Sequence, residues 1–500
     1  MQVCPELGHF VSLRKLLSAA EFVRADDVRV DGCTCDSRQV KPGDLFVALK
    51  GSRNDGRRFI AEAVERGCTA ILSDQPITDD TTLPVCTVAN AREAYGQICQ
   101  ALAGNPSHRL KVIGVTGTNG KTTTSTLVAG VLAKAGYKVG LLGTLGYFDG
   151  EEAEDSTLTT PPADQLAVWL SRMVRNGCSH AVIEVSSHAL DQARVAGIRF
   201  DAACITNVLR DHLDYHPTIQ DYRLTKSKLL DYLPAEGFAV INADDSVSAG
   251  YLRRIDGPVL TIGIRSAAEI TGTPIEHFIS EQTFLLTAGS ETMPVQTQMI
   301  GTHHVYNCLI AAAVGLTYGI DLPTVVRGLE AAGHIPGRLE RVECGQPFGV
   351  FVDYAHTPDA LAGSLQALRD VTRGSLICVF GAGGDRDRQK RPLMARAVES
   401  GADVVVLTTD NPRTEDPQII LREVFDGFWD PTAAEVIPDR AEAIRWALAT
   451  ATPGDCVLIA GKGHESYQVI GEERIPLDDF EIAREWLYKV RPYAETGGLS

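Results

Sequence analysis

The sequence lacks an excess of positive charge. Its 47 lysine and arginine residues face 64 aspartate and glutamate residues, so the formal net charge is −17 at pH 7. A broad face that binds nucleic acid needs clustered basic side chains, and this balance argues against one. Any phosphate site must therefore be a local group of cations in an acidic protein, and we expect no nucleic-acid partner.

Long apolar runs and ordered cysteine motifs are also missing. No stretch approaches the length of a membrane span, and the N-terminus has no apolar signal core. Of the 12 cysteines only Cys33 and Cys35 lie close together, and no cysteine or histidine spacing suits zinc. Several cysteines lie inside apolar runs, which is typical of buried thiols in a reducing compartment. We therefore expect a cytoplasmic protein without membrane insertion.

The length and two breaks in the pattern predict three domains. A chain of 500 residues is long enough for three domains of about 150 residues. The first break is Gly104-Asn-Pro106 and the second is Pro336-Gly-Arg338, both of which interrupt regular patterns. We place the domains at residues 1–108, 109–336 and 337–500.

One short stretch has the pattern of a phosphate-binding loop. The apolar run 111–116 ends in Gly117-Thr-Asn-Gly120, followed by Lys121-Thr-Thr-Thr124 and a helical run. A strand, a tight loop and a helix in this order direct N–H groups at one point, where an anion is favoured. Lys121 supplies charge for the β- and γ-phosphates, and the Thr122 hydroxyl can reach Mg²⁺. Val115 replaces the first glycine of the usual pattern, so a turn without a ligand is the alternative.

Strands and helices alternate on both sides of this loop. The first domain has predicted strands at 44–49, 70–73 and 85–88, with helices at 58–66 and 91–103. After the loop, buried strands of parallel type are predicted at 137–142, 180–185, 202–208 and 238–242. The region 258–300 alternates over shorter stretches, which predicts an antiparallel flank, and a helix is predicted at 304–318.

The last domain repeats the alternation. Its predicted strands lie at 349–353, 376–380, 403–407 and 456–460. Each strand ends in a polar or glycine-rich loop, and four such loops at one sheet edge form the rim of a site. We therefore predict an α/β fold of three domains, with a central doubly wound P-loop sheet and a C-terminal Rossmann-like domain.

Polar residues at the strand ends are the first candidates for chemistry. Glu184 ends the strand predicted beside the P-loop strand, where bound Mg²⁺ and nucleotide need an oxygen ligand. His212 follows the next strand and is a possible second ligand; simple solvation of Glu184 is the alternative. Lys226 lies in a helical run, and the pattern alone favours a solvated surface lysine. Arg338 and Asp353 are candidates for the triphosphate and a ribose hydroxyl.

Charged residues on the C-terminal loops form a second group. Arg386 and Arg413 lie on neighbouring loops, and guanidinium groups bind carboxylates through two parallel hydrogen bonds. Glu465, on a third loop, suits an ammonium group. Both signs of charge together fit an amino acid, whereas ordinary surface ion pairs are the alternative.

Nine short motifs, in the same order along the chain, resemble those of a known family. The chain resembles the Mur ligases, the ATP-dependent amide-bond enzymes of peptidoglycan precursor synthesis, and most closely their diaminopimelate-adding members. The matching stretches are Asp36-Ser-Arg38, Gly117-Thr-Asn-Gly-Lys-Thr-Thr123, Thr159-Thr-Pro161, Glu184-Val-Ser-Ser-His188, Asp211-His-Leu-Asp-Tyr-His216, Asp353-Tyr-Ala-His-Thr-Pro358, Gly384-Asp-Arg-Asp387, Asp410-Asn-Pro-Arg413 and Gly461-Lys-Gly-His-Glu465.

The resemblance implies a role for each domain and for named residues. It implies UDP-sugar-binding, ATP-binding and amino-acid-binding domains in that order, acting on small-molecule substrates, and we expect a monomer. The residues implied to bind ATP are Gly117, Thr118, Asn119, Gly120, Lys121, Thr122, Thr123, Asn307, Arg338 and Asp353. Those implied to hold the UDP-sugar substrate are Ser37, Thr159, Thr160, Ser186, Gln192 and Arg194. Those implied to hold Mg²⁺ are Thr122, Glu184, His212 and Lys226, the last as a carbamate.

The same resemblance implies the amino acid. The residues implied to bind diaminopimelate are Arg386, Asp410, Asn411, Pro412, Arg413, Gly461 and Glu465. Diaminopimelate has a second carboxylate where lysine has only hydrogen, so Arg413 gives that group a partner. One stretch departs from the family: Gly301-Thr-His-His304 stands where relatives commonly have Gly-x-Phe-Asn. We therefore leave His303 and His304 out of the predicted site.

The implied reaction is ATP-dependent ligation of a carboxylate to an amine. A glutamyl carboxylate attacks the γ-phosphorus of ATP, and the amine then displaces phosphate from the acyl phosphate. Lys121, Lys226, Glu184 and His212 are the predicted catalytic residues, with ATP and Mg²⁺ required. The alternatives are a lysine-adding member, a folate polyglutamate synthetase, and a P-loop regulatory protein that only hydrolyses nucleotide.

Overall fold

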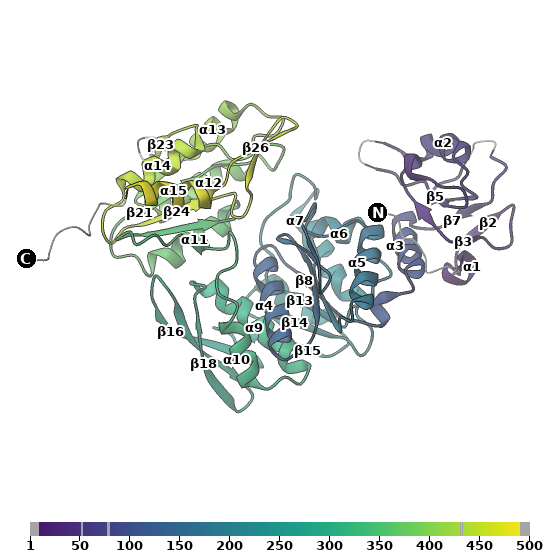
Figure 1. Ribbon diagram of the computed structural model, residues 1–500, viewed down its shortest axis with the longest axis horizontal. Helices are drawn as coiled ribbons and strands as arrows, with labels where there is room; N and C mark the ends of the chain where they lie inside the picture. Colours follow the sequence, from purple (N-terminus) through teal and green to yellow (C-terminus); the bar gives the residue numbers. More distant parts are fainter. Residues whose placement is uncertain (1–9, 52–53, 78–80, 431, 433, 491–500) are drawn as a thin grey trace, which may run out of the picture.

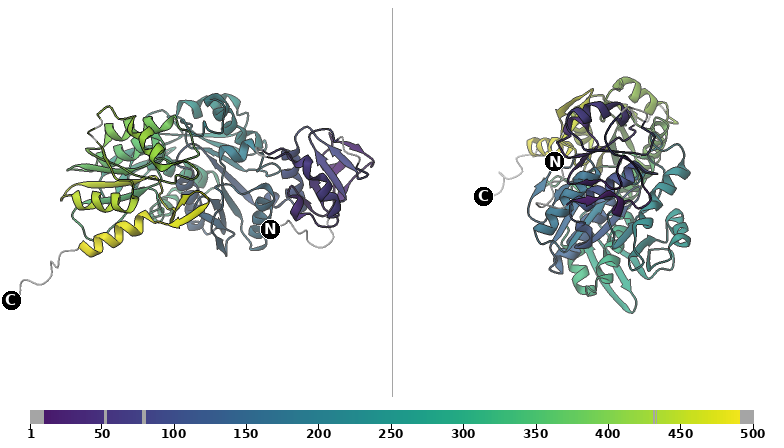
Figure 2. Two further views of the ribbon diagram at one scale, coloured as in Figure 1. Left: turned by 90° about the horizontal axis from the view of Figure 1, so that it is seen from above. Right: turned by 90° about the vertical axis from the view of Figure 1, so that its right-hand side faces the viewer.

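The computed structural model describes residues 10–51, 54–77, 81–430, 432 and 434–490. Within these residues three large sheets follow one another along the chain (Figure 1). Seen from above, the three lie in a row, with the N-terminal sheet at one end and the C-terminal sheet at the other (Figure 2). None of the helices in the described ranges is long and apolar enough to cross a membrane.

The N-terminal sheet has five strands in the order β2-β7-β6-β5-β4. Its strands are β2 (Glu21–Val23), β4 (Cys33–Thr34), β5 (Leu45–Val47), β6 (Ala70–Ser73) and β7 (Val85–Thr87). The side chain of Ile71 packs on the face that carries α2 (Ile60–Glu65), while Ala70 and Leu72 pack on the face that carries α3 (Ala91–Leu102). This alternation confirms the predicted strands, because successive strand residues point to opposite faces.

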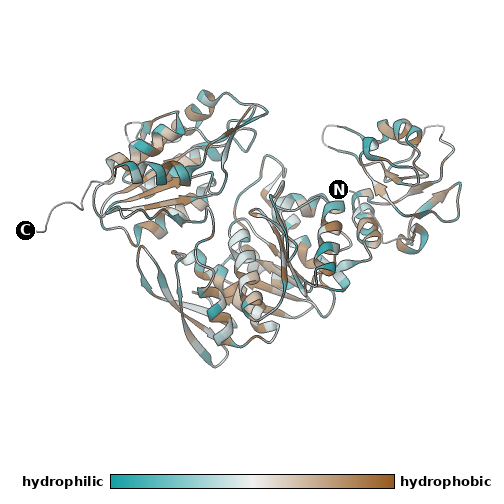
Figure 3. Cartoon of the chain, viewed as in Figure 1, coloured by the Kyte–Doolittle hydropathy of each residue, from teal (hydrophilic) through white to brown (hydrophobic). Residues whose placement is uncertain are grey.

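The central sheet has eleven strands in the order β11-β10-β9-β12-β8-β13-β14-β15-β16-β17-β18. The parallel core follows the predicted strands: β8 (Lys111–Thr116), β9 (Val139–Gly143), β12 (His180–Glu184), β13 (Ala202–Ile205) and β14 (Phe238–Asn242). Both faces are buried, and the apolar strands stand out in the hydropathy colouring (Figure 3).

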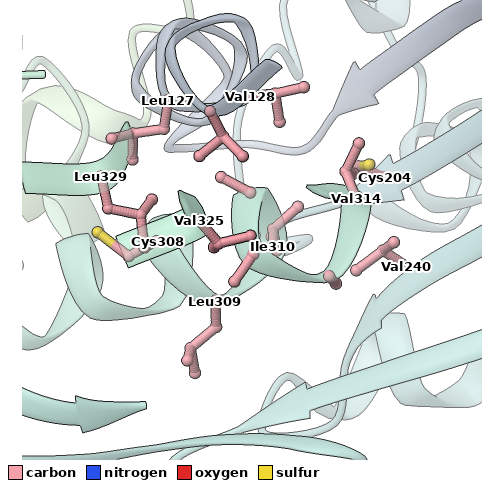
Figure 4. Close-up of a cluster of buried hydrophobic side chains, with 14 of the residues drawn as sticks. Leu127, Val128, Cys204, Val240, Cys308, Leu309, Ile310, Val314, Val325 and Leu329 are labelled. Carbon is pink, nitrogen blue, oxygen red and sulfur yellow. The ribbon is translucent and has the colours of Figure 1, made fainter. Parts of the chain in front are cut away.

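Helices cover both faces of this sheet. One face is covered by α4 (Lys121–Lys134), α9 (Thr302–Thr317) and α10 (Leu322–Glu330), whose apolar side chains form the cluster in Figure 4. The other is covered by α5 (Ala163–Arg175), α6 (Ser187–Asp191) and α7 (Ile219–Ser227). Ala163 and Ala167 of α5 also pack against α3, which joins the N-terminal sheet to the central one.

The edges of the central sheet are antiparallel, but the flank begins later than predicted. Strand β15 (Val259–Gly263) still pairs in parallel with β14, because the chain returns to the same sheet edge after β14. Strand β16 (Ile270–His277) also pairs in parallel with β15, and antiparallel pairing starts between β16 and β17 (Gln282–Ala288) and continues to β18 (Glu291–Thr297). At the opposite edge lies the hairpin of β10 (Gly146–Phe148) and β11 (Ala153–Glu154).

The C-terminal sheet has six strands in the order β19-β20-β24-β21-β22-β23. Its strands are β19 (Glu340–Arg341), β20 (Gly349–Asp353), β21 (Leu376–Phe380), β22 (Val404–Leu407), β23 (Ala434–Val436) and β24 (Cys456–Ala460). One face packs on α11 (Pro358–Arg369), α12 (Lys390–Gly401) and α13 (Pro417–Phe425), and the other on α14 (Arg440–Thr450) and α15 (Asp479–Val490). The predicted α/β class is confirmed.

Candidate active site

The P-loop lies between β8 and α4, at the carboxyl end of the sheet. Gly117 and Gly120 have φ of +151° and +83°, conformations that favour glycine. A Cβ at Gly120 would collide with the side chain of Asn307 from α9. The Thr118 N–H donates to the carbonyl of Asn207 (2.8 Å), which fixes the loop on the end of β13. The N-terminus of α4 is thereby presented to a cavity.

Two lysines meet on the P-loop, the half-buried Lys121 and the buried Lys226. Nζ of Lys121 donates to the carbonyls of Gly117 and Thr118, both at 2.9 Å, and Nζ of Lys226 donates to the same Gly117 carbonyl at 2.7 Å. Lys226 is 1% exposed, so the interpretation of a solvated surface lysine is wrong. Burial holds the pKa of Lys226 well below its usual value, and the charge of Lys121 lowers it further. The unprotonated amine is therefore more accessible at Lys226 than at an exposed lysine.

Glu184 ends β12 directly beside the P-loop strand, opposite Val115. It is 2% exposed, so simple solvation of a strand-end carboxylate is excluded. Its Oε2 accepts hydrogen bonds from the hydroxyls of Thr122 and Thr144, each at 3.0 Å, and its Oε1 accepts one from the Thr144 N–H at 2.9 Å. A carboxylate and a hydroxyl therefore meet at the phosphate end of the cavity.

His212 lies in a ring-rich corner of the same site. Its φ is +54°, a conformation that is uncommon outside glycine and that occurs at functional sites. Its Nε2 is 3.4 Å from the Asp211 carboxylate, and its ring stacks edge-on with His188. Burial lowers the pKa of His212 to about 3, although Asp211 opposes the shift. The imidazole is thus neutral near pH 7, with a ring nitrogen able to bind a metal.

Arg338 joins the central and C-terminal parts of the site. Its Nη2 donates to the Thr122 hydroxyl at 3.0 Å, and its guanidinium lies 4.6 Å from the centre of the Tyr354 ring. Asp353, at the end of β20, accepts hydrogen bonds from the N–H groups of Leu339 (3.2 Å) and Tyr354 (2.8 Å). These contacts hold the two sheets against the same cavity.

The cavity has a volume of about 320 Å³ and brings most of the predicted nucleotide and metal residues together. The predicted residues that line it are Thr118, Asn119, Gly120, Lys121, Thr122, Thr123, Thr159, Ser186, His212, Lys226, Asn307, Arg338 and Asp353. Gly117 and Glu184 are not lining residues, but they contact Lys121 and Thr122 directly.

The predicted sugar-substrate residues fall into two places. Thr160 donates to the Glu184 carbonyl (2.7 Å) and accepts from the Ser186 N–H (3.0 Å). Arg194 donates to the Thr160 carbonyl (2.8 Å) and to Gln192, so this group lies beside the cavity. Ser37 lies apart in the N-terminal part of the fold, where it is 6% exposed and donates to Glu62 at 2.7 Å.

The residues predicted to bind the amino-acid substrate lie on the loops after β21, β22 and β24. A Cβ at Gly383 would lie 2.9 Å from Nη1 of Arg413 and 3.9 Å from Cγ of Arg386, so both arginines approach the same glycine. Among the described residues neither has a carboxylate oxygen within 4.0 Å, and the surface ion-pair interpretation is therefore wrong. Burial lowers the pKa of Arg413, and the charge of Arg386 lowers it further.

Acidic groups lie on the same three loops. Glu465 accepts hydrogen bonds from Asn411 (2.7 Å) and Lys462 (3.3 Å). Oδ2 of Asp410 is buried without a protein partner, and Gly461 leaves room for it because a Cβ there would touch this oxygen. The predicted Pro412 follows in the same loop, and its carbonyl lies close to Gly384. Unpaired cations and an unpaired carboxylate oxygen are what a zwitterionic ligand requires.

Sequence reasoning missed two residues at the site. His304 lines the cavity, is 2% exposed, and has both ring nitrogens buried without a protein partner. The signal was present in the unusual Gly301-Thr-His-His304 stretch. Lys390 is 8% exposed at the start of α12, and burial lowers its pKa although Asp211 opposes the shift. No local pattern distinguishes Lys390 from a solvated helix lysine.

Three family models match successive parts of the chain. Residues 29–102 match "Mur ligase family, catalytic domain", residues 115–315 match "Mur ligase middle domain", and residues 337–463 match "Mur ligase, glutamate ligase domain". The chain belongs to the Mur ligase family. It is therefore an ATP-dependent ligase, which confirms the resemblance drawn from its motifs.

Curated relatives in this family match the chain over nearly its whole length. UDP-N-acetylmuramoyl-L-alanyl-D-glutamate–2,6-diaminopimelate ligase of Geobacillus thermodenitrificans is 44% identical over 456 residues, covering 90% of this chain and 93% of that protein. The protein with the same name from Aquifex aeolicus is 42% identical, covering 92% and 94%.

Solved structures of a diaminopimelate ligase and of a folylpolyglutamate synthase share the fold. One diaminopimelate ligase of the same name has a TM-score of 0.69 at 31% identity and covers 96% of this chain and 99% of that one. A Mycobacterium tuberculosis folylpolyglutamate synthase complexed with ADP and AMPPCP has a TM-score of 0.61 at 21% identity, covering 74% and 92%. The second likeness concerns the fold alone.

Proposed function

We propose that this Mur ligase adds meso-diaminopimelate to UDP-N-acetylmuramoyl-L-alanyl-D-glutamate in peptidoglycan precursor synthesis. The observation that carries the proposal is the pair of neighbouring arginines, Arg386 and Arg413, neither of which forms an ion pair within 4.0 Å with a carboxylate of the described residues. A ligand with carboxylates at both ends supplies the missing charge. The names of the curated relatives agree with this substrate.

The reaction proceeds in two steps, formation of an acyl phosphate and attack on it by the amine. An oxygen of the D-glutamyl side-chain carboxylate attacks the γ-phosphorus of ATP, the bond to the β-phosphate oxygen breaks, and ADP leaves with its electrons. The neutral amine of diaminopimelate then attacks the acyl carbon, loses a proton, and expels phosphate to leave the amide. No side-chain nucleophile is required, so the protein acts by positioning its substrates and stabilising charge.

The P-loop and its neighbours hold ATP in this proposal. The N–H groups at the start of α4 and the ammonium of Lys121 receive the phosphates, since the helix N-terminus and the cation both favour negative charge. Arg338, which already donates to Thr122, approaches the phosphates from the C-terminal part. Asn307 lies against Gly120, and Asp353 ends β20 at the far side of the cavity.

Thr122 and Glu184 fit a magnesium site. Their oxygens are the hard ligands that Mg²⁺ prefers, and the ion neutralises charge on the phosphates when it is bound. No group of three histidine, cysteine, aspartate or glutamate side chains with metal geometry occurs in the described parts of the chain. This suits an ion that is completed by nucleotide phosphates rather than by a protein cage.

Lys226 is the proposed site of carbamylation. A neutral amine attacks carbon dioxide, forms an N–C bond and releases a proton, and burial favours the neutral amine of Lys226 by lowering its pKa. The product is an anion beside the P-loop, which would supply a further oxygen ligand where the amine stood. His212 approaches the same corner and is the proposed fourth member of the metal set, with Thr122, Glu184 and the carbamate.

The remaining predicted residues are assigned to the two other substrates. Thr159 and Ser186 line the cavity, and Thr160, Gln192 and Arg194 lie beside it; we assign all five to the part of the substrate that carries the glutamyl carboxylate. Ser37 belongs to the N-terminal part, which we assign to the UDP end of the substrate. The domain limits at residues 108 and 336 and the monomeric state stay predictions.

A cytoplasmic location is part of the same proposal. Nine cysteines in the described ranges are buried free thiols, namely Cys33, Cys68, Cys86, Cys99, Cys178, Cys204, Cys308, Cys378 and Cys456. Free buried thiols persist in a reducing compartment, which supports this location.

The experiment measures phosphate release from ATP with the UDP-linked dipeptide, in parallel with meso-diaminopimelate, with L-lysine and with no amine. We expect release with diaminopimelate alone and its loss in Lys121→Ala. Release with lysine alone would show a lysine-adding enzyme and overturn the proposed specificity. Release that ignores both amines would indicate a nucleotidase and overturn the ligase assignment.

A further inference from the structure

A buried ion-pair network lies behind the loops that carry Arg386 and Arg413. At its centre is Arg391, at the start of α12, whose side chain is 1% exposed. Its two terminal nitrogens donate to the two carboxylate oxygens of Glu415 at 2.8 and 3.0 Å, and Nη1 also donates to Glu423 at 2.6 Å. Two parallel bonds of this kind fix the orientation as well as the position of both groups.

The network acts on a single peptide group between Gly384 and Asp385. Oε1 of Glu415 accepts the Asp385 N–H at 2.6 Å, while Nη1 of Arg413 donates to the Gly384 carbonyl at 2.7 Å. These are the two ends of one planar amide, so a rotation of that amide breaks both bonds at once. Glu415 thus holds one end of the group on which the Arg413 guanidinium rests.

The local backbone does not hold this peptide by itself. Asp385 has φ of +52° and Arg413 has φ of +53°, both in the left-handed region. Such conformations persist only when surrounding contacts determine them. The Asp385 carboxylate supplies one such contact by accepting the Thr414 hydroxyl at 2.8 Å, and the Arg391–Glu415 pair supplies another. The backbone of Arg413 is also held by hydrogen bonds with Val469 (3.0 Å) and Gly471 (2.7 Å).

We propose that Arg391 is a positioning residue for the amino-acid site: through Glu415 it fixes the 384–385 peptide and hence the guanidinium of Arg413. The inference rests on the proposed function, because it assigns Arg413 to the distal carboxylate of diaminopimelate. Arg391 itself is turned away from the ligand, since its Nη atoms are taken up by Glu415, Glu423 and the Gly383 carbonyl.

The test uses Arg391→Lys and Glu415→Ala, together with the double variant. Lysine keeps the positive charge but cannot form the two parallel bonds. We expect KM for diaminopimelate to rise about tenfold in each single variant, the effect of one lost charge-assisted hydrogen bond. The kcat and the KM for ATP stay unchanged. The preference for diaminopimelate over lysine falls by the same factor, because only diaminopimelate uses Arg413.

A matched control separates positioning from general stability. Arg172 in α5 pairs with Asp149 at 2.7 Å and Glu154 at 2.6 Å, and its side chain is 14% exposed. It contacts none of the proposed site residues, so Arg172→Lys loosens a comparable network elsewhere. We expect that variant to leave the KM for diaminopimelate and the preference over lysine unchanged.

The double variant and amide exchange give the deciding outcomes. If Arg391 acts through Glu415, the KM for diaminopimelate of the double variant is no higher than that of the more impaired single variant. If the two residues acted independently, the two increases in KM would multiply. Three results would each overturn the inference. They are an unchanged preference for diaminopimelate over lysine in Arg391→Lys, an equal rise in the KM of every substrate, and single-variant effects that multiply in the double variant. If the wild-type enzyme accepts neither amino acid, the proposed function fails, and hydrogen exchange at the Asp385 amide still decides the inference: exchange faster than wild type in both variants supports it, and equal exchange refutes it.

Discussion

The substitution Arg413→Met separates ligand binding from stability. In the proposed complex Arg413 forms charge-assisted hydrogen bonds to the distal carboxylate of diaminopimelate. Such hydrogen bonds contribute about 1.5–3 kcal/mol each. Because the site is half-buried, we take about 3 kcal/mol for the two bonds together, less than twice the upper value. A loss of about 3 kcal/mol corresponds to a decrease in kcat/KM of on the order of 100-fold.

The same substitution leaves the folded protein almost as stable as before. Methionine loses the bond from Nη1 to the Gly384 carbonyl, which contributes about 1 kcal/mol. It also removes the repulsion between Arg413 and Arg386, together with the attraction of Asp410 and Glu465 that partly offsets it. The two changes oppose each other, so we expect the free energy of unfolding to change by less than about 1 kcal/mol.

The change in kcat/KM is measured from initial rates of phosphate release against diaminopimelate concentration, at saturating ATP and UDP-linked dipeptide. The change in the free energy of unfolding is measured by urea unfolding. As a control, Arg172→Met breaks a network of paired carboxylates and should lose stability while keeping its KM for diaminopimelate. A change in kcat/KM below about threefold, or an equal loss with lysine as the amine, would refute the role given to Arg413.

Three further substitutions test other parts of the account. Lys226→Ala removes the amine that accepts carbon dioxide; we expect at least about a 100-fold loss of kcat, and native mass spectrometry of the wild type should show one added carbon dioxide that the variant lacks. Gly120→Ala places a Cβ against Asn307 at a φ of +83°, so ATP affinity measured by calorimetry should fall by about tenfold, with a strain of about 1–2 kcal/mol. Burial lowers the pKa of His180 to about 4, so its imidazole stays neutral in the folded state but takes up a proton in the unfolded state below about pH 6.5. The free energy of unfolding should therefore fall by about 1 kcal/mol from pH 7.5 to 5.5. In urea unfolding, His180→Gln should reduce this pH dependence.

Much of the fold could be predicted because its central strands are buried on both faces. Cys456–Ala460 is apolar throughout and Phe238–Asn242 is apolar except for its last residue; both are bounded by loops and too short for helices. The short strands of the edges were missed. The hairpin of β25 (Tyr467–Ile470) and β26 (Glu473–Pro476) is largely exposed and mixed in composition, so no period separates it from a loop.

The site was predictable where a local pattern fixes the backbone, and not where distant chain segments meet. Lys121 follows a glycine turn and precedes a helix, which is sufficient to identify it. Lys226 needed the family resemblance, because its burial depends on how α7 packs and not on its own neighbours in sequence. The pair of Arg391 and Glu415 is separated by 24 residues and belongs to no motif, so only the three-dimensional structure reveals it.

The most direct measurement is a competition between the two amino acids in one reaction. The enzyme is given ATP, Mg²⁺, the UDP-linked dipeptide and equal concentrations of meso-diaminopimelate and L-lysine, and the UDP-linked products are identified by mass spectrometry. The account predicts that the diaminopimelate product exceeds the lysine product by on the order of 100-fold, the contribution assigned to the bonds of Arg413. A lysine product in equal or greater amount, or ADP formation without either product, would contradict it.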